Sequence, residues 1–419
     1  MSRPYATLPS TAKVEPTPFI VSVPKQQLDE LETLIKLSKL APHTYENSQL
    51  DARYGVTTDW LVAMKDQWLR SYKWRASEDR INTFPQWTIE IEDINMHFVG
   101  LFSERQDAIP ILLIHGWPGN FLEFLSILQL FKDESTPSTL PYHLIVPSLP
   151  GYTFSSGPPL DRNFGTQDIA RVLNQLMIGL GFERGYVAQG GDIGSRVARE
   201  LAVDYESCKA VHCKFFSKYY FKNECSRQKV NVVFMRQPAE VTDDHLTEIE
   251  KSGIERMANF RMLGSGYATE HGTRPSTIGH VVSTSPMALL AWQVSVGEKL
   301  LEWVDDPLTS EHILESITLY WLTETFPRSI YTYRQNYPPP PIPGANDPRW
   351  YIKKPLGFSH FPKELAPLPR SWVETTGNLV FWNQHHKGGH FAALEQPEAL
   401  KNDLIDFVQQ VWPGISGAK

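Results

Sequence analysis

The chain has 419 residues, of which 41% are hydrophobic and 21% charged, and its formal net charge is −7. This composition is ordinary for a globular protein with a large core, and the lack of a basic excess argues against nucleic acid or an anionic membrane as a partner. Residues 1–17 hold no apolar segment of signal-peptide length, and no stretch approaches the ~20 apolar residues of a membrane span. We therefore expect a soluble, cytoplasmic protein that binds or converts a small molecule.

The three cysteines give no indication of a metal site or a disulfide framework. Cys208, Cys213 and Cys225 are odd in number and have neither C-x-x-C spacing nor histidines at ligand spacing. We interpret them as reduced structural thiols and expect neither a metal nor a cofactor.

The N-terminal part of the chain is predicted to be helical. One amphipathic helix is expected over 27–37, and a second is expected to begin at Thr57 or Thr58. The pattern then changes to alternation between Phe84 and Phe98, which predicts a β-hairpin. We assign residues 1–95 to an N-terminal helical extension that packs on the core and the lid.

Continuous apolar runs predict the buried strands of a parallel sheet. Ile109–Ile114 and His143–Val146 are such runs, and each is followed by a loop rich in glycine and proline and then by a helical stretch, over 121–131 and 166–180. Repeated strand–helix units predict a doubly wound, mostly parallel α/β sheet, whose ligands bind at the carboxyl ends of the strands. Residues 96–214 are assigned to the first part of this core.

The following segment, 215–346, is predicted to be a helical lid. It lacks clear buried strands and has helical patterns over 246–263, 278–301 and 313–326. We interpret the proline run near its end, at 338–341, as a stiff linker that returns to the core.

Strand patterns return near the C-terminus, at 356–359 and 379–382, and a closing helix is expected over 397–411. We assign residues 347–419 to the second part of the core. Glu364 follows the first of these strands and His390 follows the second.

A glycine-rich turn separates a short apolar strand from a helix at Gly190-Gly191-Asp192-Ile193-Gly194. This spacing is that of a nucleophile elbow, a turn so sharp that only residues with almost no side chain fit around the exposed nucleophile. Taken alone the string is weak, and an aspartate that caps the following helix is the better interpretation.

Three residues together reverse that interpretation. Asp192, Glu364 and His390 stand in the chain order nucleophile, acid, histidine of the hydrolase fold that carries such an elbow, and each follows a predicted strand. Singly, Asp192 could cap a helix, Glu364 could be a solvated loop charge and His390 could be one of thirteen ordinary histidines. Their joint placement predicts a catalytic site.

An aspartate nucleophile selects the chemistry. A carboxylate is ionised at neutral pH and attacks a saturated carbon by displacement to give an alkyl ester. His390, oriented by Glu364, would then deprotonate a water that attacks the carbonyl carbon of Asp192. The backbone N–H groups of Trp117 and Ile193 are the expected oxyanion donors.

The substrates of such attack are epoxides or haloalkanes. A halide is usually held by a tryptophan directly after the nucleophile, and Ile193 occupies that position. An epoxide needs hydroxyl donors, typically lid tyrosines, and spacing alone does not choose among the candidates, which are Tyr219, Tyr220, Tyr267, Tyr320, Tyr331 and Tyr333.

Several functions remain open from the residues alone. The leading one is hydrolysis of an epoxide to a vicinal diol, with the epoxide and water as the small-molecule partners. In an alternative, a nucleophile within the substrate opens the epoxide, as a cyclase or rearrangement enzyme of secondary metabolism would do. A haloalkane dehalogenase and a non-enzymatic binding module are the further alternatives.

Motifs along nearly the whole chain, from about Pro18 to Val411, carry a family resemblance. They are His115-Gly116-Trp117-Pro118-Gly119, the loop from Pro147 to Tyr152, the elbow, the stretch from Arg274 to His280, and Gly388-Gly389-His390-Phe391-Ala392-Ala393. The sequence resembles microsomal-type epoxide hydrolases of the α/β-hydrolase superfamily, in particular the soluble fungal, Aspergillus-like enzymes.

The resemblance implies Asp192 as nucleophile, His390 as base and no cofactor. It aligns Tyr267 and Tyr333 with the two lid tyrosines that donate to the epoxide oxygen, and it places Glu364 where fungal relatives carry aspartate and mammalian ones glutamate. It also implies a homodimer. The chain departs from the fungal pattern in the loop over 218–237, to which we assign no role, and in an extra stretch around 293–296, so substrate choice is the least transferable property.

Overall fold

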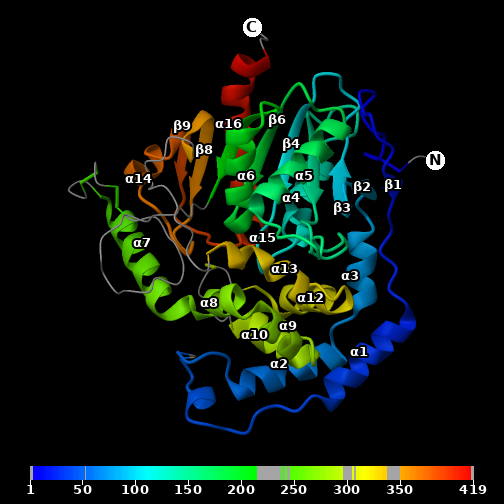
Figure 1. Ribbon diagram of the computed structural model, residues 1–419, viewed down its shortest axis with the longest axis vertical. Helices are drawn as coiled ribbons and strands as arrows, with labels where there is room; N and C mark the ends of the chain where they lie inside the picture. The colour runs from blue at the N-terminus through cyan, green and yellow to red at the C-terminus, as the bar shows by residue number, and fades with distance from the viewer. Residues whose placement is uncertain are drawn as a thin grey trace.

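A twisted sheet runs through the middle of the molecule, with helices on both of its faces and a further group of helices beyond one end of its strands (Figure 1). The computed structural model describes residues 3–51, 53–214, 237–238, 241–242, 246–295, 304–305, 308–336 and 350–416. Within these residues the strands are β1 (Thr17–Pro18), β2 (Gln86–Ile91), β3 (Ile94–Leu101), β4 (Ile109–Ile114), β5 (Tyr142–Pro147), β6 (Tyr186–Gly190), β7 (Cys208–Cys213), β8 (Ile352–His360) and β9 (Gly377–Gln384).

The helices fall into three groups along the chain. The N-terminal group is α1 (Lys25–Leu37), the short η1 (Glu46–Ser48), α2 (Thr58–Arg70) and α3 (Trp74–Ile81). The core group is η2 (Phe121–Phe124), α4 (Leu125–Glu134), α5 (Thr166–Gly179), α6 (Asp192–Asp204), α14 (Arg370–Glu374), α15 (Ala392–Glu395) and α16 (Pro397–Ser416). The lid group is α7 (Glu248–Asn259), η3 (Phe260–Gly264), α8 (Gly266–Thr273), α9 (Pro275–Val282), α10 (Pro286–Ser295), α12 (Ser310–Leu322), α13 (Phe326–Ser329) and η4 (Ile330–Asn336).

The strand order is β1-β2-β3-β5-β4-β6-β7-β8-β9. The pairs β1–β2, β2–β3 and β3–β5 are antiparallel, and every pair from β5 to β9 is parallel. This confirms the mostly parallel α/β sheet, and β2–β3 is the predicted hairpin, with Ile89 opposite Met96. Sequence patterning did not predict β7, because Lys209 and His212 interrupt its apolar run.

Both faces of the central strands are buried. On β4, Leu112 and Ile114 belong to an apolar cluster that includes residues of α5 and α6, whereas Ile111 and Leu113 belong to a second cluster with residues of α4 and α16. Successive side chains of a strand point to opposite faces, so a strand covered on both faces needs apolar residues at every position. This double burial explains why β4 is a continuous apolar run.

The lid helices differ from the prediction at one point. The pattern over 278–301 predicts one helix, but α9 ends at Val282 and α10 begins at Pro286. A proline ring clashes with the preceding helical turn and has no N–H to donate, so a helix tolerates it only near its start. The proline run, Cys225 and nearly all of the loop over 218–237 lie outside the described residues.

The N-terminal helices pack against the lid (Figure 1). The indole Nε1 of Trp68 on α2 donates a hydrogen bond to Oγ1 of Thr318 on α12 at 3.0 Å, and Arg80 on α3 pairs with Glu315 on the same lid helix. Thr57 caps α2, because its side chain accepts a hydrogen bond from the N–H of Trp60. The helix α3 was not predicted. The division of the chain into units at residues 95, 214 and 346 stays a prediction.

Among the described helices, none combines the length and apolar character that crossing a bilayer would require.

Candidate active site

Asp192 sits at the tip of a strained turn between β6 and α6. Its φ angle is +50°, which places a non-glycine residue in the left-handed region. The turn is also tightly packed: a Cβ on Gly190 would lie 2.2 Å from the carbonyl oxygen of Gly194, and a Cβ on Gly194 would lie 2.2 Å from that of Ile114. These contacts give the physical reason for the glycines of the predicted elbow.

The carboxylate of Asp192 reaches the loop after β4, where its Oδ1 accepts a hydrogen bond from the N–H of Trp117 at 2.8 Å. The N-cap position of α6 is Gly191, so Asp192 is the first residue of the helix and not its N-cap. The N–H of Ile193 also bonds this carboxylate. Both predicted oxyanion donors therefore lie at Asp192, whose side chain remains 19% exposed.

His390 and Glu364 complete the constellation from two loops beyond β8 and β9. Nε2 of His390 lies 3.7 Å from Oδ2 of Asp192, and Nδ1 of His390 hydrogen-bonds Oε1 of Glu364. The two loops are joined by a parallel bridge between Lys363 and Gly389. The structure thus brings together three residues that lie far apart in the sequence.

Lys214 also contacts this constellation, and sequence reasoning missed it. The residue directly follows β7, and its Nζ lies 3.3 Å from Oε2 of Glu364 and donates to the carbonyl oxygen of His390. Burial raises the pKa of Glu364, but the charges of His390 and Lys214 outweigh burial and lower it to about 2. Glu364 is therefore a buried carboxylate, with only 1% of its side chain exposed.

The pKa of Asp192 moves in the opposite direction. Burial raises it above the ordinary value, while the charge of His390 and the N–H groups of Ile193 and Trp117 oppose that rise. The two carboxylates of the constellation consequently have environments that separate their pKa values.

Two of the candidate tyrosines meet over the indole of Trp117. Tyr267 on α8 stacks on this ring, with centroids 5.5 Å apart and planes at 23°, and Tyr333 on η4 meets it edge-on at 5.7 Å. The two tyrosine rings are 5.9 Å apart. Burial, and then the nearby Tyr267 and Asp192, raise the pKa of Tyr333 well above its usual value, so its hydroxyl keeps its proton.

Two further candidate tyrosines, Tyr320 and Tyr331, direct their hydroxyl groups to backbone carbonyls of core loops. The hydroxyl of Tyr320 donates to the carbonyl oxygen of Gly119, and that of Tyr331 donates to the carbonyl oxygen of Pro150. Tyr219 and Tyr220 lie outside the described residues.

Two buried histidines shape the site. His115 accepts a hydrogen bond from the N–H of Leu149 through Nε2, which fixes its tautomer, and burial lowers its pKa to about 4. His271, which sequence reasoning missed, lies 5.0 Å from Tyr333 and 4.7 Å from Trp117 between ring centroids. Nothing in its local sequence distinguishes His271 from the other histidines of the chain.

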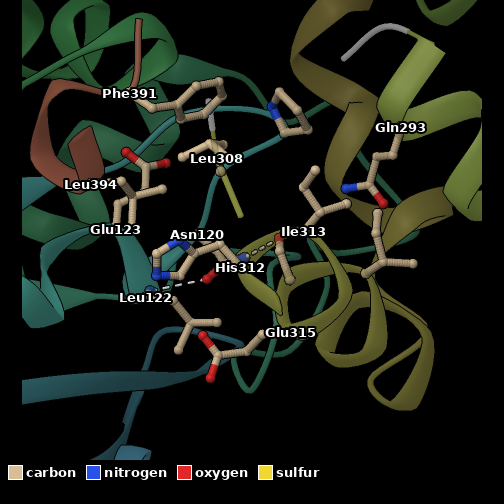
Figure 2. A pocket seen from close by; sticks show the side chains of 14 residues that line it. Asn120, Leu122, Glu123, Gln293, Leu308, His312, Ile313, Glu315, Phe391 and Leu394 are labelled. Carbon is tan, nitrogen blue, oxygen red and sulfur yellow. Dashed lines mark hydrogen bonds between the residues drawn. The ribbon is translucent and has the colours of Figure 1, made fainter. Parts of the chain in front are cut away.

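A cavity of about 60 Å³ lies between the loop after β4 and the lid helix α12, and its lining includes Pro118 and Phe391, which directly follow Trp117 and His390 in the sequence. Figure 2 shows Glu123, Asn120 and Phe391 on its core side and Ile313 and Gln293 on its lid side. Burial raises the pKa of Glu123 to about 8, although the charge of Lys214 opposes that rise. A neutral carboxyl group therefore lines this cavity at pH 7.

Comparison with known proteins identifies the family. Residues 16–124 match the family described as epoxide hydrolase N terminus, and residues 109–213 match the α/β-hydrolase fold family. The structure of Aspergillus niger epoxide hydrolase is 56% identical and superposes with a TM-score of 0.89, covering 98% of this chain and 100% of that chain. A Dothistroma septosporum protein assigned to the epoxide hydrolases is 42% identical over 414 residues, which are 96% of this chain and 92% of that protein. The chain therefore belongs to the epoxide hydrolase family of the α/β-hydrolase fold.

Proposed function

We propose that the protein hydrolyses an epoxide to a vicinal diol through a covalent ester on Asp192. The observation that carries the proposal is the position of Asp192 at the elbow, with Nε2 of His390 3.7 Å from its Oδ2 and with Tyr267 and Tyr333 gathered over the neighbouring Trp117.

In the first step the carboxylate of Asp192 attacks one ring carbon of the epoxide. A carbon–oxygen bond forms to the carboxylate, the ring carbon–oxygen bond breaks, and its electron pair goes to the ring oxygen. Tyr267 and Tyr333 donate hydrogen bonds to that oxygen, and one of them supplies its proton. The raised pKa of Tyr333 suits a donor that must enter the reaction protonated.

In the second step His390 accepts a proton from a water molecule. The water oxygen attacks the ester carbonyl carbon, and the N–H groups of Trp117 and Ile193 hold the oxyanion that forms. Collapse breaks the acyl–oxygen bond, and the leaving alkoxide takes the proton that His390 holds. The diol is then released, the other proton of the water returns to the tyrosinate, and Asp192 regains its carboxylate with the water oxygen in it. Glu364 keeps the ring of His390 in the tautomer whose Nε2 is available as base.

The replacement His390→Gln tests this sequence of events. The ester should accumulate, and the intact mass of the protein with excess epoxide should rise by the mass of one epoxide molecule. The matched control is the double variant Asp192→Asn with His390→Gln, which should show no adduct. Absence of an adduct on folded His390→Gln protein, over a panel of styrene-type, aliphatic and polyketide epoxides that the parent enzyme turns over, contradicts the proposal.

Isotopically labelled water separates hydrolysis from internal ring opening by the substrate itself. In a single turnover in H2¹⁸O, hydrolysis puts the label into the carboxylate of Asp192, and later turnovers transfer it to the diol. A cyclised product without solvent oxygen would instead assign the enzyme to epoxide rearrangement. The dehalogenase alternative requires halide release from a haloalkane, and Ile193 in place of an indole donor disfavours it.

A further inference from the structure

Lys214 is a buried cation in direct contact with the acid and base of the site. Its side chain is 4% exposed, its Nζ lies 3.3 Å from Oε2 of Glu364, and the same ammonium donates to the backbone carbonyl of His390. The space that it occupies depends on Gly191, since a Cβ there would lie 2.5 Å from Cε of Lys214. A buried lysine needs such partners, because an unpaired charge in the interior is costly.

The surroundings of His390 and Lys214 are strongly acidic. Asp192 on α6 and Glu364 in the loop after β8 face the imidazole. The carboxyl of Asp305 accepts a hydrogen bond from the N–H of Gly388, in the loop after β9 that carries His390. Burial raises the pKa of Glu123 on η2 to about 8 and that of Glu395 on α15 to about 7, and the charge of Lys214 opposes both rises. At Glu364 the charges of His390 and Lys214 outweigh burial and lower the pKa.

This arrangement bears on the base of the second step. His390 must be unprotonated when it takes a proton from water, yet a histidine beside an uncompensated buried carboxylate holds its proton tightly. Lys214 is a cation beside Oε2 of Glu364, and its charge reduces the attraction between this carboxylate and a proton on His390. The hydrogen bond between Nδ1 of His390 and Oε1 of Glu364, which orients the imidazole, remains in place.

We propose that Lys214 is a positioning residue that pairs with Glu364, so that Glu364 orients His390 without keeping it protonated during hydrolysis of the ester. The inference rests on the proposed function, because it assigns Lys214 a part in the ester-cleaving step. It adds a fourth side chain, from the end of β7, to the constellation of Asp192, Glu364 and His390.

The test compares two replacements of Lys214. Lys214→Met removes the charge at similar length, and Lys214→Arg keeps it. Rapid-quench measurements should separate ester formation from ester cleavage at each pH. In Lys214→Met the acid limb of the cleavage rate should move to higher pH by about one unit, as expected for loss of one nearby charge. Ester should then accumulate at neutral pH.

Lys401→Met is the matched control, since Lys401 on α16 is also a buried lysine but pairs with Glu134 on α4 and not with a residue of the constellation. Its cleavage profile should follow that of the parent, and Lys214→Arg should retain the parental acid limb. A cleavage profile in Lys214→Met that coincides with the parent's overturns the inference, although ester formation itself would still support the proposed function. Failure of the parent to form any ester would count against the proposed function instead.

A second variant covers the case in which Lys214→Met does not fold. The double variant Lys214→Met with Glu364→Gln has no uncompensated carboxylate in this position, so it should recover folding as judged by circular dichroism and a cooperative thermal transition. If the double variant is as unfolded as the single one, the pairing with Glu364 is not what Lys214 supplies, and the inference fails.

Discussion

Gly194 lies so close to the end of β4 that a Cβ on it would meet the carbonyl oxygen of Ile114 at 2.2 Å. The elbow is therefore wedged against the strand whose following loop carries Trp117, the donor to Asp192. The turn that carries Asp192 and the strand that leads to Trp117 are therefore packed directly against each other.

Gly194→Ala should disrupt this wedge. The new methyl group would clash with backbone atoms of Ile114 and His115, which cannot move aside by a rotamer change. We therefore expect a destabilisation of about 1–3 kcal/mol, and a loss of activity even in the molecules that remain folded. Urea unfolding and turnover at a fixed folded fraction measure the two effects. Gly414→Ala is the control, because nothing lies within 4 Å of a Cβ there. Equal activity per folded molecule in both variants would contradict this view of the elbow.

Tyr267→Phe and Tyr333→Phe should each slow ester formation while leaving ester cleavage less affected. Each change removes one hydroxyl donor to the ring oxygen and keeps the ring packed near Trp117. Removal of one such donor costs about 100-fold, and the double variant should lose more than either single one. Tyr331→Phe serves as the control, since its hydroxyl bonds Pro150 in the core loop. If Tyr331→Phe lowers ester formation as strongly as the other two, the choice of tyrosines is wrong.

Ester formation should fail at low pH through protonation of Asp192. Only the carboxylate is nucleophilic, and burial raises the pKa of Asp192 above its ordinary value of about 3.9. The single-turnover rate should therefore rise with pH to a plateau, with its midpoint above the ordinary pKa of an aspartate. His390→Gln protein isolates this step from cleavage. A midpoint at or below the ordinary value would show that the N–H donors outweigh burial.

Glu123→Gln should stabilise the protein increasingly as pH rises. The folded-state pKa of Glu123 is raised to about 8, so between the ordinary glutamate value of about 4 and pH 8 the folded protein binds more protons at this site than the unfolded chain. The free energy of unfolding of the parent therefore falls as pH rises through that window. Glutamine does not titrate, so the variant lacks this pH-dependent loss of stability. Urea midpoints from pH 5 to 8 should diverge in favour of the variant. Glu255 is exposed, so the urea midpoints of Glu255→Gln should stay parallel to those of the parent from pH 5 to 8. If the midpoints of Glu123→Gln also run parallel to the parent's, the pKa of Glu123 is not raised.

The site could be predicted from sequence where neighbours along the chain determine it. Asp192 is defined by the glycines two positions away on either side, because the turn itself demands them. Lys214 could not be found in this way, since its partner Glu364 lies 150 positions further along the chain. The residues next to Lys214 and Glu364 in the sequence contain no motif that indicates this pairing. His271 was missed for the same reason.

The tyrosines illustrate a second limit. Spacing could not choose among six of them, because the lid helices are placed by their packing on the core and on one another. The family resemblance singled out Tyr267 and Tyr333, and among the candidate tyrosines that the structure describes, these two meet the ring of Trp117. The buried strands of the sheet, by contrast, could be predicted from the sequence, because burial on two faces requires a continuous apolar run. The strand β7 was not predicted, because Lys209 and His212 interrupt its apolar run.

The hydrogen bond from Trp68 to Thr318 and the pair between Arg80 and Glu315 bear on the shape of the cavity at α12. They attach α12 to the N-terminal helices α2 and α3, and α12 carries Ile313 and Ile317 into the wall of that cavity. The N-terminal helices therefore support this wall from behind. We expect substitutions at Trp68 or Arg80 to change the shape of the cavity while Asp192, Glu364 and His390 stay untouched.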